Sequence, residues 1–542
     1  MFAKKTLTLH PKTLTHMNSS FDMVAKTFQG LEGVLAEELR GIGAENVQEG
    51  KRMVSFTGDL AILYKANMCC RTALRILKPF YTFEASDPDE LYARVKDFDW
   101  STLMNDSQTF AIDTVAFSEE FRHSQFVTYR VKDGIVDWFR DRYGDDHRPR
   151  VRLDGADILL NVHISGTRVT LSLDSSGESL HKRGWRKAQT EAPINEVLAA
   201  GIILMTGWRG ETPFVDPMCG SGTFAIEAAM IAAGINPGIY RKHFAFENWP
   251  DFDAELLDEI YNDDSNEREV TVPIVAADIS PRAIAIATEN AKSAAVARYI
   301  TFETRPISQW TEAPKPAGVL VTNPPYGKRI GSDDMNALYD TIGRVLKHVF
   351  TGYHAWIIGY EDVYFHEIGL APSTKVAINN GGLDCELREY VIFEGKKADF
   401  RAAGGRISNE NREESRPRKA DRAPRKGAFN GDKPARREGR PEGRSEGRSF
   451  RKEGRFEGRP EGRPFRKDRD AAPVRFEKKP ARKFDEAEEP KKERRPLKLD
   501  RLGRQPSIPA EKTVIISRPS WRVRKKDQNN DNNTDNNTNS DK

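Results

Sequence analysis

The sequence predicts an α/β protein, and three observations support this fold class. Between residues 21 and 184, short strand-like runs alternate with helical patterns, which indicates a small α+β module in two subdomains. From there to about Gly395, strands and helices alternate regularly, as in a doubly wound parallel sheet. Beyond residue 400, charged residues, Gly, Pro and Asn dominate, and the few apolar residues cannot offset the chain entropy of folding. We therefore expect a disordered tail.

The elements of the N-terminal module follow from their apolar spacing. Apolar residues recur at helical spacing over residues 31–39 and stop at glycine, which predicts a helix. Residues 108–117 predict a strand, and residues 124–144 predict an amphipathic helix. Residues 157–177 predict a β-hairpin with Gly166 in its turn.

The second region begins with a basic hinge, HKRGWRKAQ at residues 181–189, and a helix that has Pro193 near its start. The strands and helices that follow are, in order, PFVDPMCGSG, TFAIEAAMIAAG, PIVAADIS, PRAIAIATENAKSAA, ITFET, GVLVTNPP, MNALYDTIGRVLKHVF and HAWIIGY. The region closes with KVAINNGGLDCELREYVIFE, where Asn380-Gly381 between two strand patterns indicates an antiparallel hairpin.

The charge of the chain is unevenly distributed. The whole sequence contains 85 Lys and Arg against 81 Asp and Glu, a net charge of +4. Residues 401–542 hold 42 of these basic and 25 of these acidic residues, or +17, which leaves 43 and 56, or −13, for residues 1–400. An acidic body with a basic tail suggests that the tail is the part that meets a polyanion.

Cysteine usage and hydropathy exclude several classes of protein. The four cysteines are Cys69, Cys70, Cys219 and Cys385. They show no metal-ligand spacing, and the adjacent pair is a poor disulfide candidate. No run approaches the roughly 18–20 apolar residues of a membrane span, and the basic start lacks the apolar core of a secretory signal. We expect a reduced, cytoplasmic protein without metal or membrane contact, and a monomer because no pattern suggests an oligomeric seam.

The stretch FVDPMCGSGTF has the features of a ligand site at the mouth of a parallel sheet. Asp216 ends a strand, and Gly220 and Gly222 open an Ala-rich helix, so a ligand can approach bare backbone there. Residues 220–225 also satisfy the G-x-G-x-x-A pattern of dinucleotide-binding proteins, but that pattern alone is weak. In those proteins the ribose-binding acid lies about 20 residues further on. Here the next strand ends at Asp278, 56 residues after Gly222.

An amino-acid-bearing nucleoside fits these features better, because Asp216 precedes the glycines, where it can hold an ammonium group. S-adenosylmethionine would place its methionine end near Asp216 and the glycine turn, and its ribose hydroxyls would reach Asp278. Two alternatives stay open. Asp216 is a simple cap of the following helix, or Asp278 is a plain helix N-cap, since Ser280 and Pro281 also mark a helix start.

The tetrapeptide Asn323-Pro324-Pro325-Tyr326 ends the apolar strand pattern of residues 319–321 abruptly. Two prolines fix φ and remove two backbone donors, so no ladder or helix can continue. They would hold the side-chain oxygen of Asn323 and the carbonyl of Pro324 against the N–H groups of an exocyclic amine, with its lone pair aimed at a methyl donor. Tyr326 would stack on the substrate ring, a contact worth roughly 1–3 kcal/mol. The alternative is a stiff loop with no chemical task.

With these motifs the chain resembles the class I S-adenosylmethionine-dependent methyltransferases that carry the Asn-Pro-Pro-Tyr motif of amino-methylating enzymes. More narrowly, SLHKRGWR, APINEVLAAGIIL, DPMCGSGTFAIEAA and TNPPYGKRIG resemble the THUMP-domain RNA guanine-N2 methyltransferases, especially those acting on large-subunit (23S) ribosomal RNA. The resemblance covers about residues 22–395. It implies a Rossmann-like methyltransferase domain, an RNA substrate, guanosine N2 as acceptor and S-adenosyl-L-methionine as cofactor.

The resemblance also implies domains and site residues. The expected domains are a ferredoxin-like subdomain (22–66), a THUMP RNA-binding domain (67–178), the methyltransferase domain (179–396) and a disordered Arg/Gly-rich basic tail (397–542). The expected catalytic residues are Asn323, Pro324, Pro325 and Tyr326. The expected cofactor-binding residues are Asp216, Met218, Gly220, Ser221, Gly222, Thr223, Asp278, Ile279 and Asn323. After the third strand many class I enzymes place an acid or amide near the adenine, whereas this chain has Arg305-Pro306, with Ser308 or Gln309 as candidate substitutes.

Basic residues outside the tail are weaker candidates for RNA contact. The expected RNA-binding residues are Lys132, Lys182, Arg183 and Arg186, with Lys187 beside the last of them. In the hinge these side chains would face phosphates while Trp185 packs between domains; the alternative is a solvated linker. For Lys132 and the other basic residues of its helix, the alternative is that they are ordinary surface charges.

The tail has a stronger claim to RNA. Six Glu-Gly-Arg triplets lie between Glu438 and Arg463, interleaved with Pro, Ser and Phe, so phosphate attraction and ring stacking occur together. The interspersed Glu weakens the attraction, and we expect loose, salt-sensitive binding that raises the local concentration of substrate. A solubilising tail without RNA contact is the alternative.

Three hypotheses of different class remain. The first is a methyltransferase of ribosomal or transfer RNA. The second is a methyltransferase of DNA adenine or protein glutamine, because Asn-Pro-Pro-Tyr serves those groups too. The third is a non-catalytic RNA-binding protein of ribosome assembly. The THUMP-like module and the Arg-Gly tail favour the first, and the intact glycines and tetrapeptide argue against the third.

The tail hypothesis has a direct test. Truncation of the chain after Gly395 is expected to weaken RNA binding chiefly at low salt, because a phosphate contact releases counterions. Binding measured at several salt concentrations would show a shallower salt dependence for the truncated protein. An unchanged slope would exclude the tail as a phosphate contact.

Overall fold

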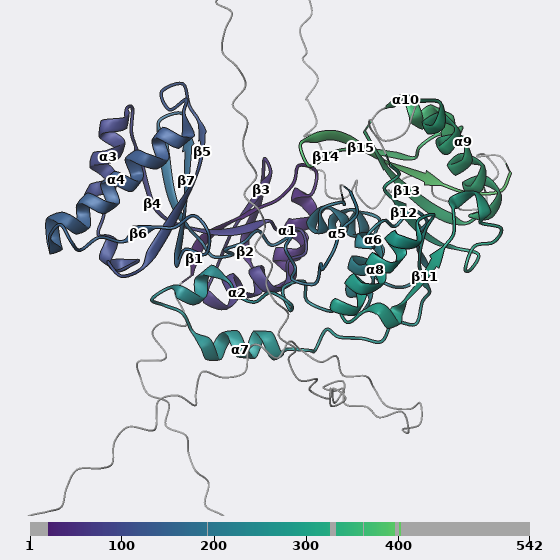
Figure 1. The fold of residues 1–542 in the computed structure, drawn as a ribbon, viewed down its shortest axis with the longest axis horizontal. Helices are drawn as coiled ribbons and strands as arrows, with labels where there is room; N and C mark the ends of the chain where they lie inside the picture. The colour runs from purple at the N-terminus through teal and green to yellow at the C-terminus, as the bar shows by residue number, and fades with distance from the viewer. Residues whose placement is uncertain are drawn as a thin grey trace, which may run out of the picture. The chain divides into compact units, whose positions relative to one another are not determined.

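The computed structural model describes residues 20–395 apart from 192, 326–331 and 361, together with residues 400 and 402. Apart from those last two positions, the expected disordered tail at 397–542 lies outside the described residues. The described part of the chain contains two β-sheets, one for each predicted half (Figure 1). The predicted α/β fold class is confirmed.

The N-terminal module is built on one eight-stranded sheet with the order β2-β3-β1-β4-β8-β7-β5-β6. Its strands are β1 (Phe21–Lys26), β2 (Glu45–Gly50), β3 (Met53–Gly58), β4 (Arg75–Glu84), β5 (Thr109–Phe117), β6 (Arg150–Val151), β7 (Ile158–Ser165) and β8 (Arg168–Asp174). Its helices are α1 (Glu32–Gly41), α2 (Leu60–Cys69), α3 (Pro88–Asp97) and α4 (Ser124–Tyr143). The helices and strand expected from apolar spacing are therefore confirmed, as is the hairpin, in which Gly166 has a φ of 62°.

The strand β4 joins the two predicted subdomains into a single sheet. Its first residues pair with β1, and pairing with β8 continues along its length to Glu84. In Figure 1 the helices α3 and α4 lie side by side next to the β4–β7 part of this sheet. The two subdomains thus share hydrogen-bonded backbone instead of meeting through a linker.

The second half is a seven-stranded sheet with the order β11-β10-β9-β12-β13-β15-β14. Its strands are β9 (Phe214–Asp216), β10 (Ile274–Asp278), β11 (Ile300–Thr304), β12 (Gly318–Thr322), β13 (Tyr353–Gly359), β14 (Thr374–Asn380) and β15 (Leu383–Val391). Its helices are α5 (Glu196–Met205), α6 (Thr223–Ala232), α7 (Ala254–Asn262), α8 (Pro281–Ser293), α9 (Ser332–Val349) and α10 (Asp362–Phe365). The five strands from β11 to β13 are parallel, and β14 and β15 form the expected antiparallel hairpin.

Two local features of this half differ in detail from expectation. The hairpin turn is one residue later than predicted, because Gly381 and Gly382 hold the positive φ values of 61° and 91°. The helix α5 begins after Asn195, whose side chain accepts hydrogen bonds from the backbone of Val197 and Leu198, so Pro193 precedes the cap.

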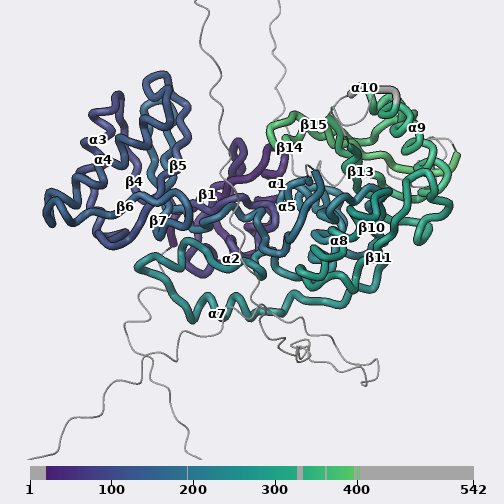
Figure 2. The backbone as a smooth tube through the Cα atoms, viewed as in Figure 1, coloured from purple at the N-terminus to yellow at the C-terminus, as the bar shows by residue number. Residues whose placement is uncertain are grey.

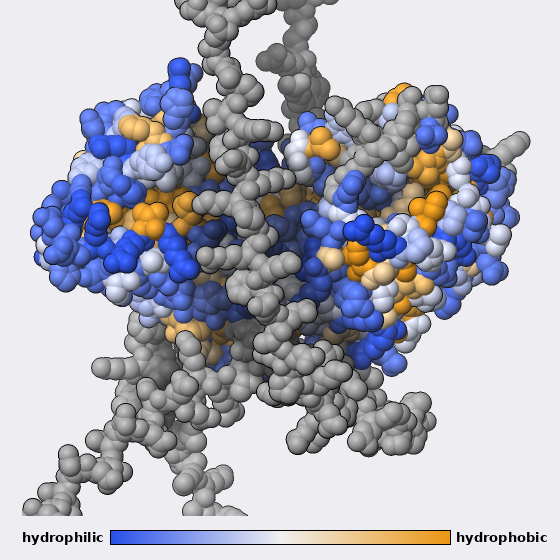
Figure 3. All heavy atoms as spheres, in the orientation of Figure 1, coloured by the Kyte–Doolittle hydropathy of each residue, from blue (hydrophilic) through white to orange (hydrophobic). Residues whose placement is uncertain are grey.

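Strand β12 is buried on both faces, as the apolar run at 319–321 predicted. Val319 and Val321 pack into the hydrophobic cluster that includes residues of α6 and α8, whereas Leu320 packs into the cluster on the α9 side. Their exposed fractions are 9%, 0% and 1%. On the coloured part of the face that Figure 3 shows, hydrophilic residues predominate and hydrophobic residues form separate patches. No helix among the described residues is long and apolar enough to cross a membrane.

The segment between α6 and β10 packs on the N-terminal module, which the sequence did not reveal. Phe246 stacks on Tyr64 of α2 with ring centroids 4.3 Å apart, and its backbone N–H donates to the carbonyl of Ser175 over 3.1 Å. The hydroxyl of Tyr64 accepts a hydrogen bond of 2.9 Å from the backbone of Asp253. Figure 2 shows the tube of α7 running beneath α2, with which it is in contact. The second half of the described chain therefore packs directly on the N-terminal module.

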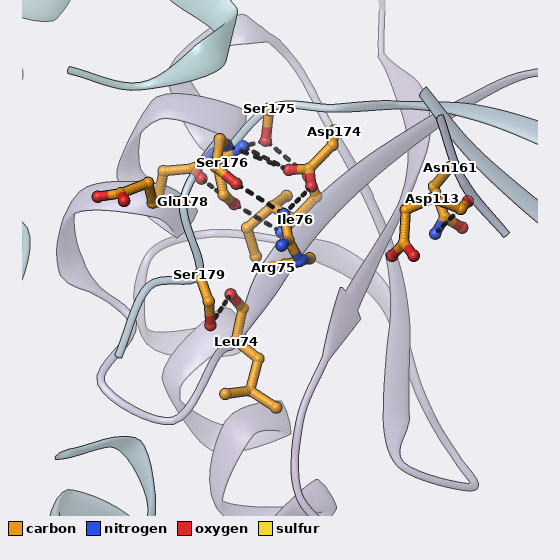
Figure 4. A network of polar contacts seen from close by, with 12 residues as sticks. Leu74, Arg75, Ile76, Asp113, Asn161, Asp174, Ser175, Ser176, Glu178 and Ser179 are labelled. Carbon is orange, nitrogen blue, oxygen red and sulfur yellow. Dashed lines mark hydrogen bonds and ion pairs between the residues drawn. The ribbon is translucent and has the colours of Figure 1, made fainter. Parts of the chain in front are cut away.

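A buried polar network begins where β8 leaves the sheet (Figure 4). Asp174 pairs with Arg75 and accepts a hydrogen bond of 2.9 Å from the backbone of Ser176, and burial raises its pKa. The hydroxyl of Ser175 donates to the carbonyl of Ile76 over 2.7 Å, and the hydroxyl of Ser176 accepts from the Ile76 backbone over 2.9 Å. The chain therefore enters the hinge in a fixed conformation.

The hinge itself is not a solvated linker. Arg183 is 2% exposed and pairs with Glu227 of α6, which is 0% exposed, at 3.3 Å. Its guanidinium also donates to the carbonyls of Leu180 (3.0 Å) and Arg71 (2.5 Å). Trp185 is fully buried. Our expectation that Arg183 contacts RNA phosphate is wrong, because its guanidinium is buried and its donors are paired with Glu227 and with backbone carbonyls.

Two of the other predicted RNA contacts remain available. Lys182 is exposed and pairs with Glu178 at 2.9 Å, and Lys132 pairs with Asp133 at 2.5 Å on α4. Nothing in these contacts tests an RNA role, so both stay predictions.

The burial of Arg183 predicts the effect of its loss. Arg183→Met removes one partner of a buried pair and is expected to cost about 3–5 kcal/mol of unfolding free energy. The matched control, Lys182→Met, removes an exposed neighbour and is expected to change stability by less than about 0.5 kcal/mol. Denaturant unfolding measures both. Equal stability of the two variants, with weaker RNA binding by Arg183→Met, would contradict the structural role.

Candidate active site

Three strand ends meet where the order of the parallel sheet reverses. The first strand β9 has β10 on one side and β12 on the other, so Asp216, Asp278 and Asn323 follow adjacent strands at the same edge. Ligands of open α/β sheets bind at such a reversal, outside the carboxyl ends of the strands. The residues that the sequence singled out are thereby brought together.

The turn from β9 into α6, which we call the cofactor turn (residues 220–223), requires glycine. Gly220 and Gly222 have φ values of 53° and 84°. A Cβ atom on Gly222 would lie 2.9 Å from the Cβ of Ala287 in α8, closer than carbon atoms approach. The backbone N–H of Gly220 donates to Asp278 over 2.9 Å. The turn is therefore held tightly against the neighbouring strand and helix.

Asp278 does more than cap a helix. One carboxylate oxygen accepts from Gly220, and the other accepts from the backbone of Ser280 over 2.8 Å. The N-cap of α8 is Ser280, whose hydroxyl accepts from Ala283. The N-cap alternative for Asp278 is thus wrong. A half-buried carboxylate with remaining lone pairs fits the hydroxyls of a ribose.

Asp216 is a buried carboxyl group of unusual basicity. It is 1% exposed, and one oxygen accepts from the hydroxyl of Thr322 over 3.2 Å and from the backbone of Met218 over 3.3 Å. Burial raises the pKa of Asp216 to about 8, and the nearby charge of Asp278 contributes. It does not cap α6, whose N-cap residue is Gly222 and which has no side-chain cap. A carboxyl group in this setting is stabilised as the anion by an incoming cation.

Asn323 presents an unused acceptor. Its Oδ1 atom is buried and has no hydrogen-bond partner among the described residues. Such an atom costs free energy unless a ligand satisfies it. Pro324 is buried and Pro325 half-buried, while Tyr326 lies outside the described residues. The orphan oxygen therefore fits a donor N–H group at the end of β12.

The other expected cofactor residues have diverse positions. Ile279 is 71% exposed, an apolar surface that a bound ring would cover, and Met218 is half-buried. The hydroxyls of Ser221 and Thr223 accept hydrogen bonds from Arg186 over 3.0 and 2.9 Å. Arg186 was expected to contact phosphate. Its three guanidinium nitrogens each donate inside the protein, to Glu196, Ser221 and Thr223, and the phosphate contact stays a prediction.

The structure also describes the segment after β11, which was expected to lie near the adenine. Arg305 pairs with Glu303 at 2.5 Å and lies 3.8 Å from the centre of the Trp310 ring. The candidate substitutes, Ser308 and Gln309, are exposed in a short 3-10 helix. These contacts leave the adenine contact untested.

The set of groups fits S-adenosylmethionine. Asp216 is an acceptor for an ammonium group, the cofactor turn offers bare backbone, and Asp278 suits a ribose. No cluster of His, Cys, Asp and Glu that could hold a metal ion occurs in the described part of the chain.

Comparison with known proteins agrees with this geometry. Three family models match the chain: an RlmL ferredoxin-like domain over residues 22–77, a THUMP domain over 85–174 and an RMKL-like methyltransferase domain over 183–389. A putative RNA methyltransferase of Synechocystis sp. (slr0064) is 37% identical over 386 residues, which cover 71% of this chain and 100% of the relative. The chain belongs to the RMKL-like methyltransferase family.

Other relatives place the family in context. The ribosomal RNA large subunit methyltransferase K/L of Syntrophotalea carbinolica is 38% identical over 391 residues, and the match spans only 54% of that protein. The crystal structure of SMU.472, a putative methyltransferase complexed with SAH, has a TM-score of 0.63 and 30% identity, covering 70% of this chain and 100% of that one. A possible methylase from Clostridium difficile 630 has a TM-score of 0.64, 31% identity and the same coverages. S-adenosylmethionine is the cofactor of this family.

The raised pKa of Asp216 predicts a pH-dependent stability. The folded-state pKa of about 8 exceeds the value of about 4 of an exposed aspartate. The free protein therefore loses stability as pH rises between these two values. Asp216→Asn removes the buried charge and is expected to raise the melting temperature of the free protein, more at pH 8 than at pH 5.

The same variant should lose affinity for the cofactor. We expect S-adenosylhomocysteine to raise the melting temperature of Asp216→Asn less than that of the wild type, because the amide does not attract an ammonium group. Asp340→Asn, which alters an exposed carboxylate of α9, is the control. If the difference in melting temperature between the wild type and Asp216→Asn were the same at every pH, the raised pKa of Asp216 would be refuted.

Proposed function

We propose that the protein transfers the methyl group of S-adenosylmethionine to the exocyclic N2 amine of a guanosine in RNA, specifically large-subunit (23S) ribosomal RNA. The observation that carries the proposal is the buried, unpaired oxygen of Asn323 at the end of β12, beside the strand that ends in Asp216. The THUMP match at residues 85–174 and the names of the relatives support RNA as the substrate class.

Asn323 and Pro324 orient the amine in this proposal. The lone pair of an exocyclic amine is delocalised into its ring, which makes the nitrogen a poor nucleophile. Two acceptors, Asn323 Oδ1 and the Pro324 carbonyl, would take its N–H groups and favour a pyramidal nitrogen. The prolines keep both acceptors fixed, so little reorganisation is needed as charge develops. An amide does not take up a proton, and the alkylated nitrogen releases its own to water.

The remaining site residues hold the cofactor. S-adenosylmethionine supplies a methyl group on a positively charged sulfur. Asp216 receives the ammonium group, while the cofactor turn and Asp278 receive the rest of the molecule. The acceptors on β12 then face the methyl group, because β12 is the next strand of the sheet after β9.

The substrate base must leave its stack to reach this site. An amine inside a helix is inaccessible to a group at the edge of a sheet, so the guanosine is flipped out, with Tyr326 proposed as its stacking partner. The N-terminal module would hold the surrounding structured RNA, with Lys132 of that module and Lys182 of the hinge as proposed contacts. Cytoplasmic location and a monomeric state stay predictions from the sequence.

Analysis of modified nucleosides tests the proposal. Mass spectrometry of ribosomal RNA from a deletion strain is expected to show loss of one N2-methylguanosine, restored by the purified protein and cofactor. Loss of the same nucleoside from transfer RNA would redirect the proposal to that substrate.

The rival substrates give a different result in the same experiment. A structural neighbour from Listeria monocytogenes, with 30% identity and a TM-score of 0.61, bears the name of an N6-adenine-specific DNA methylase. Loss of methylated adenine from DNA, or of methylated glutamine from protein, with unchanged RNA would therefore overturn the proposal.

Asn323 provides the sharpest test by mutation. Asn323→Ala is expected to abolish methyl transfer while S-adenosylhomocysteine binds within a few-fold of the wild-type affinity, because the amide acts on the amine. Calorimetry measures binding, and methyl incorporation into RNA measures turnover. Asn262→Ala, at the exposed end of α7, is the control. Persistent turnover in Asn323→Ala would exclude the amine-acceptor role.

A further inference from the structure

Arg186 ties the hinge to the cofactor turn. Its Nε atom donates to Glu196 over 2.6 Å, and its two terminal nitrogens donate to the hydroxyls of Ser221 and Thr223. The Arg186 and Glu196 side chains are 17% and 6% exposed. A guanidinium has donors only, so both hydroxyls must act as acceptors toward it.

A second side chain clamps the same segment. Asn290 of α8 is fully buried, and its Oδ1 atom accepts from the backbone of Lys187 (2.8 Å) and Ala188 (3.3 Å). Its amide nitrogen donates to the carbonyls of Ala188 (2.9 Å) and Ser221 (3.1 Å). Asn290 therefore joins α8, the hinge and the cofactor turn: its oxygen accepts two hydrogen bonds and its nitrogen donates two.

Residues 186–190, which we call the strap, lie against the turn. The hydroxyl of Thr190 would be 3.4 Å from a Cβ atom on Gly220. The chain just before the strap is fixed at Gly184, where φ is 100° and a Cβ atom would meet the carbonyl of Tyr240 at 2.2 Å. The cofactor turn thus has the strap on one side and Ala287 of α8 on the other.

We propose that Arg186 is a positioning residue for the amino-acid end of the cofactor. Through Ser221 and Thr223, which are 2% and 3% exposed, it fixes the conformation of the cofactor turn, whose bare backbone the amino-acid end of the cofactor would meet. Its loss therefore weakens binding of the methionine or homocysteine part and spares the nucleoside part. The proposal rests on S-adenosylmethionine being the cofactor, and it gives the hinge arginine a role other than RNA contact.

Two ligands separate this role from a general structural one. S-adenosylhomocysteine carries the amino-acid end, and 5′-methylthioadenosine lacks it. Calorimetry on the full-length protein is expected to show that Arg186→Gln weakens the first ligand by about tenfold or more, the effect of leaving polar partners unsatisfied. The affinity for the second ligand is expected to change by less than about threefold.

Matched variants complete the experiment. Arg186→Lys keeps the charge but offers one compact donor group, so we expect an intermediate loss. Lys187→Gln removes the exposed neighbouring charge and is expected to leave both affinities unchanged. If Arg186→Gln does not fold, Glu196→Gln keeps the arginine, removes its charged partner and is expected to show a smaller loss with the same preference.

Each contrary outcome has a distinct meaning. Unchanged binding of S-adenosylhomocysteine by Arg186→Gln, or an equal loss of both ligands, would overturn the positioning role. Weaker RNA binding with a reduced salt slope and normal cofactor affinity would overturn it in favour of a phosphate contact. A wild-type protein that binds neither ligand would refute the proposed function instead.

Discussion

The buried pair of Arg183 and Glu227 is the constraint on which the rest of the structure depends. Two charges are removed from water here, which is costly unless further hydrogen bonds satisfy them. The arginine meets this requirement through the carbonyls of Leu180 and Arg71. Arg71, at the end of the N-terminal subdomain, itself donates to the carbonyl of Ile235 beyond α6. Three parts of the chain thereby converge on the flank of α6, the helix whose first turn forms the cofactor turn.

This convergence makes the hinge a structural element of the catalytic half. Arg241 donates to the carbonyls of Ser176, Glu178, Ser179 and Lys182, in and just before the hinge, at distances between 2.7 and 3.1 Å. Burial lowers the pKa of Arg241 to about 10. Arg186 and Asn290 continue the same pattern toward the strand ends. Arg183, Arg186 and Arg241 are basic residues of a kind that could bind a polyanion. Here they donate hydrogen bonds to groups inside the protein, among them backbone carbonyls and buried carboxylates. Exposed side chains such as Lys182 stay the predicted contacts for RNA.

Two polar groups at the strand ends, Asp216 and Asn323, differ in how they respond to charge. Asp216 stays close to neutral when free, because burial disfavours its anion. An ammonium group would shift it toward the anion, so binding and ionisation are coupled. Asn323, in contrast, is an acceptor that cannot change its charge. The first group suits the recognition of a cation, and the second suits an amine whose charge changes during reaction.

Much of the fold and site could be predicted from the sequence alone, because these features depend on local patterns. Alternating apolar runs determine strands, glycines with positive φ determine the cofactor turn, and two prolines end β12. Since parallel strands carry their carboxyl ends to one edge, the meeting of Asp216, Asp278 and Asn323 followed as well. The roles of Arg183 and Arg186 could not be predicted, because these residues contact partners far away in the sequence. Arg183 pairs with Glu227, 44 residues further on, and Arg186 contacts hydroxyls of the cofactor turn 35 and 37 residues further on. A basic residue in a sequence is read as solvated, and only the tertiary structure decides which ones meet a buried acid.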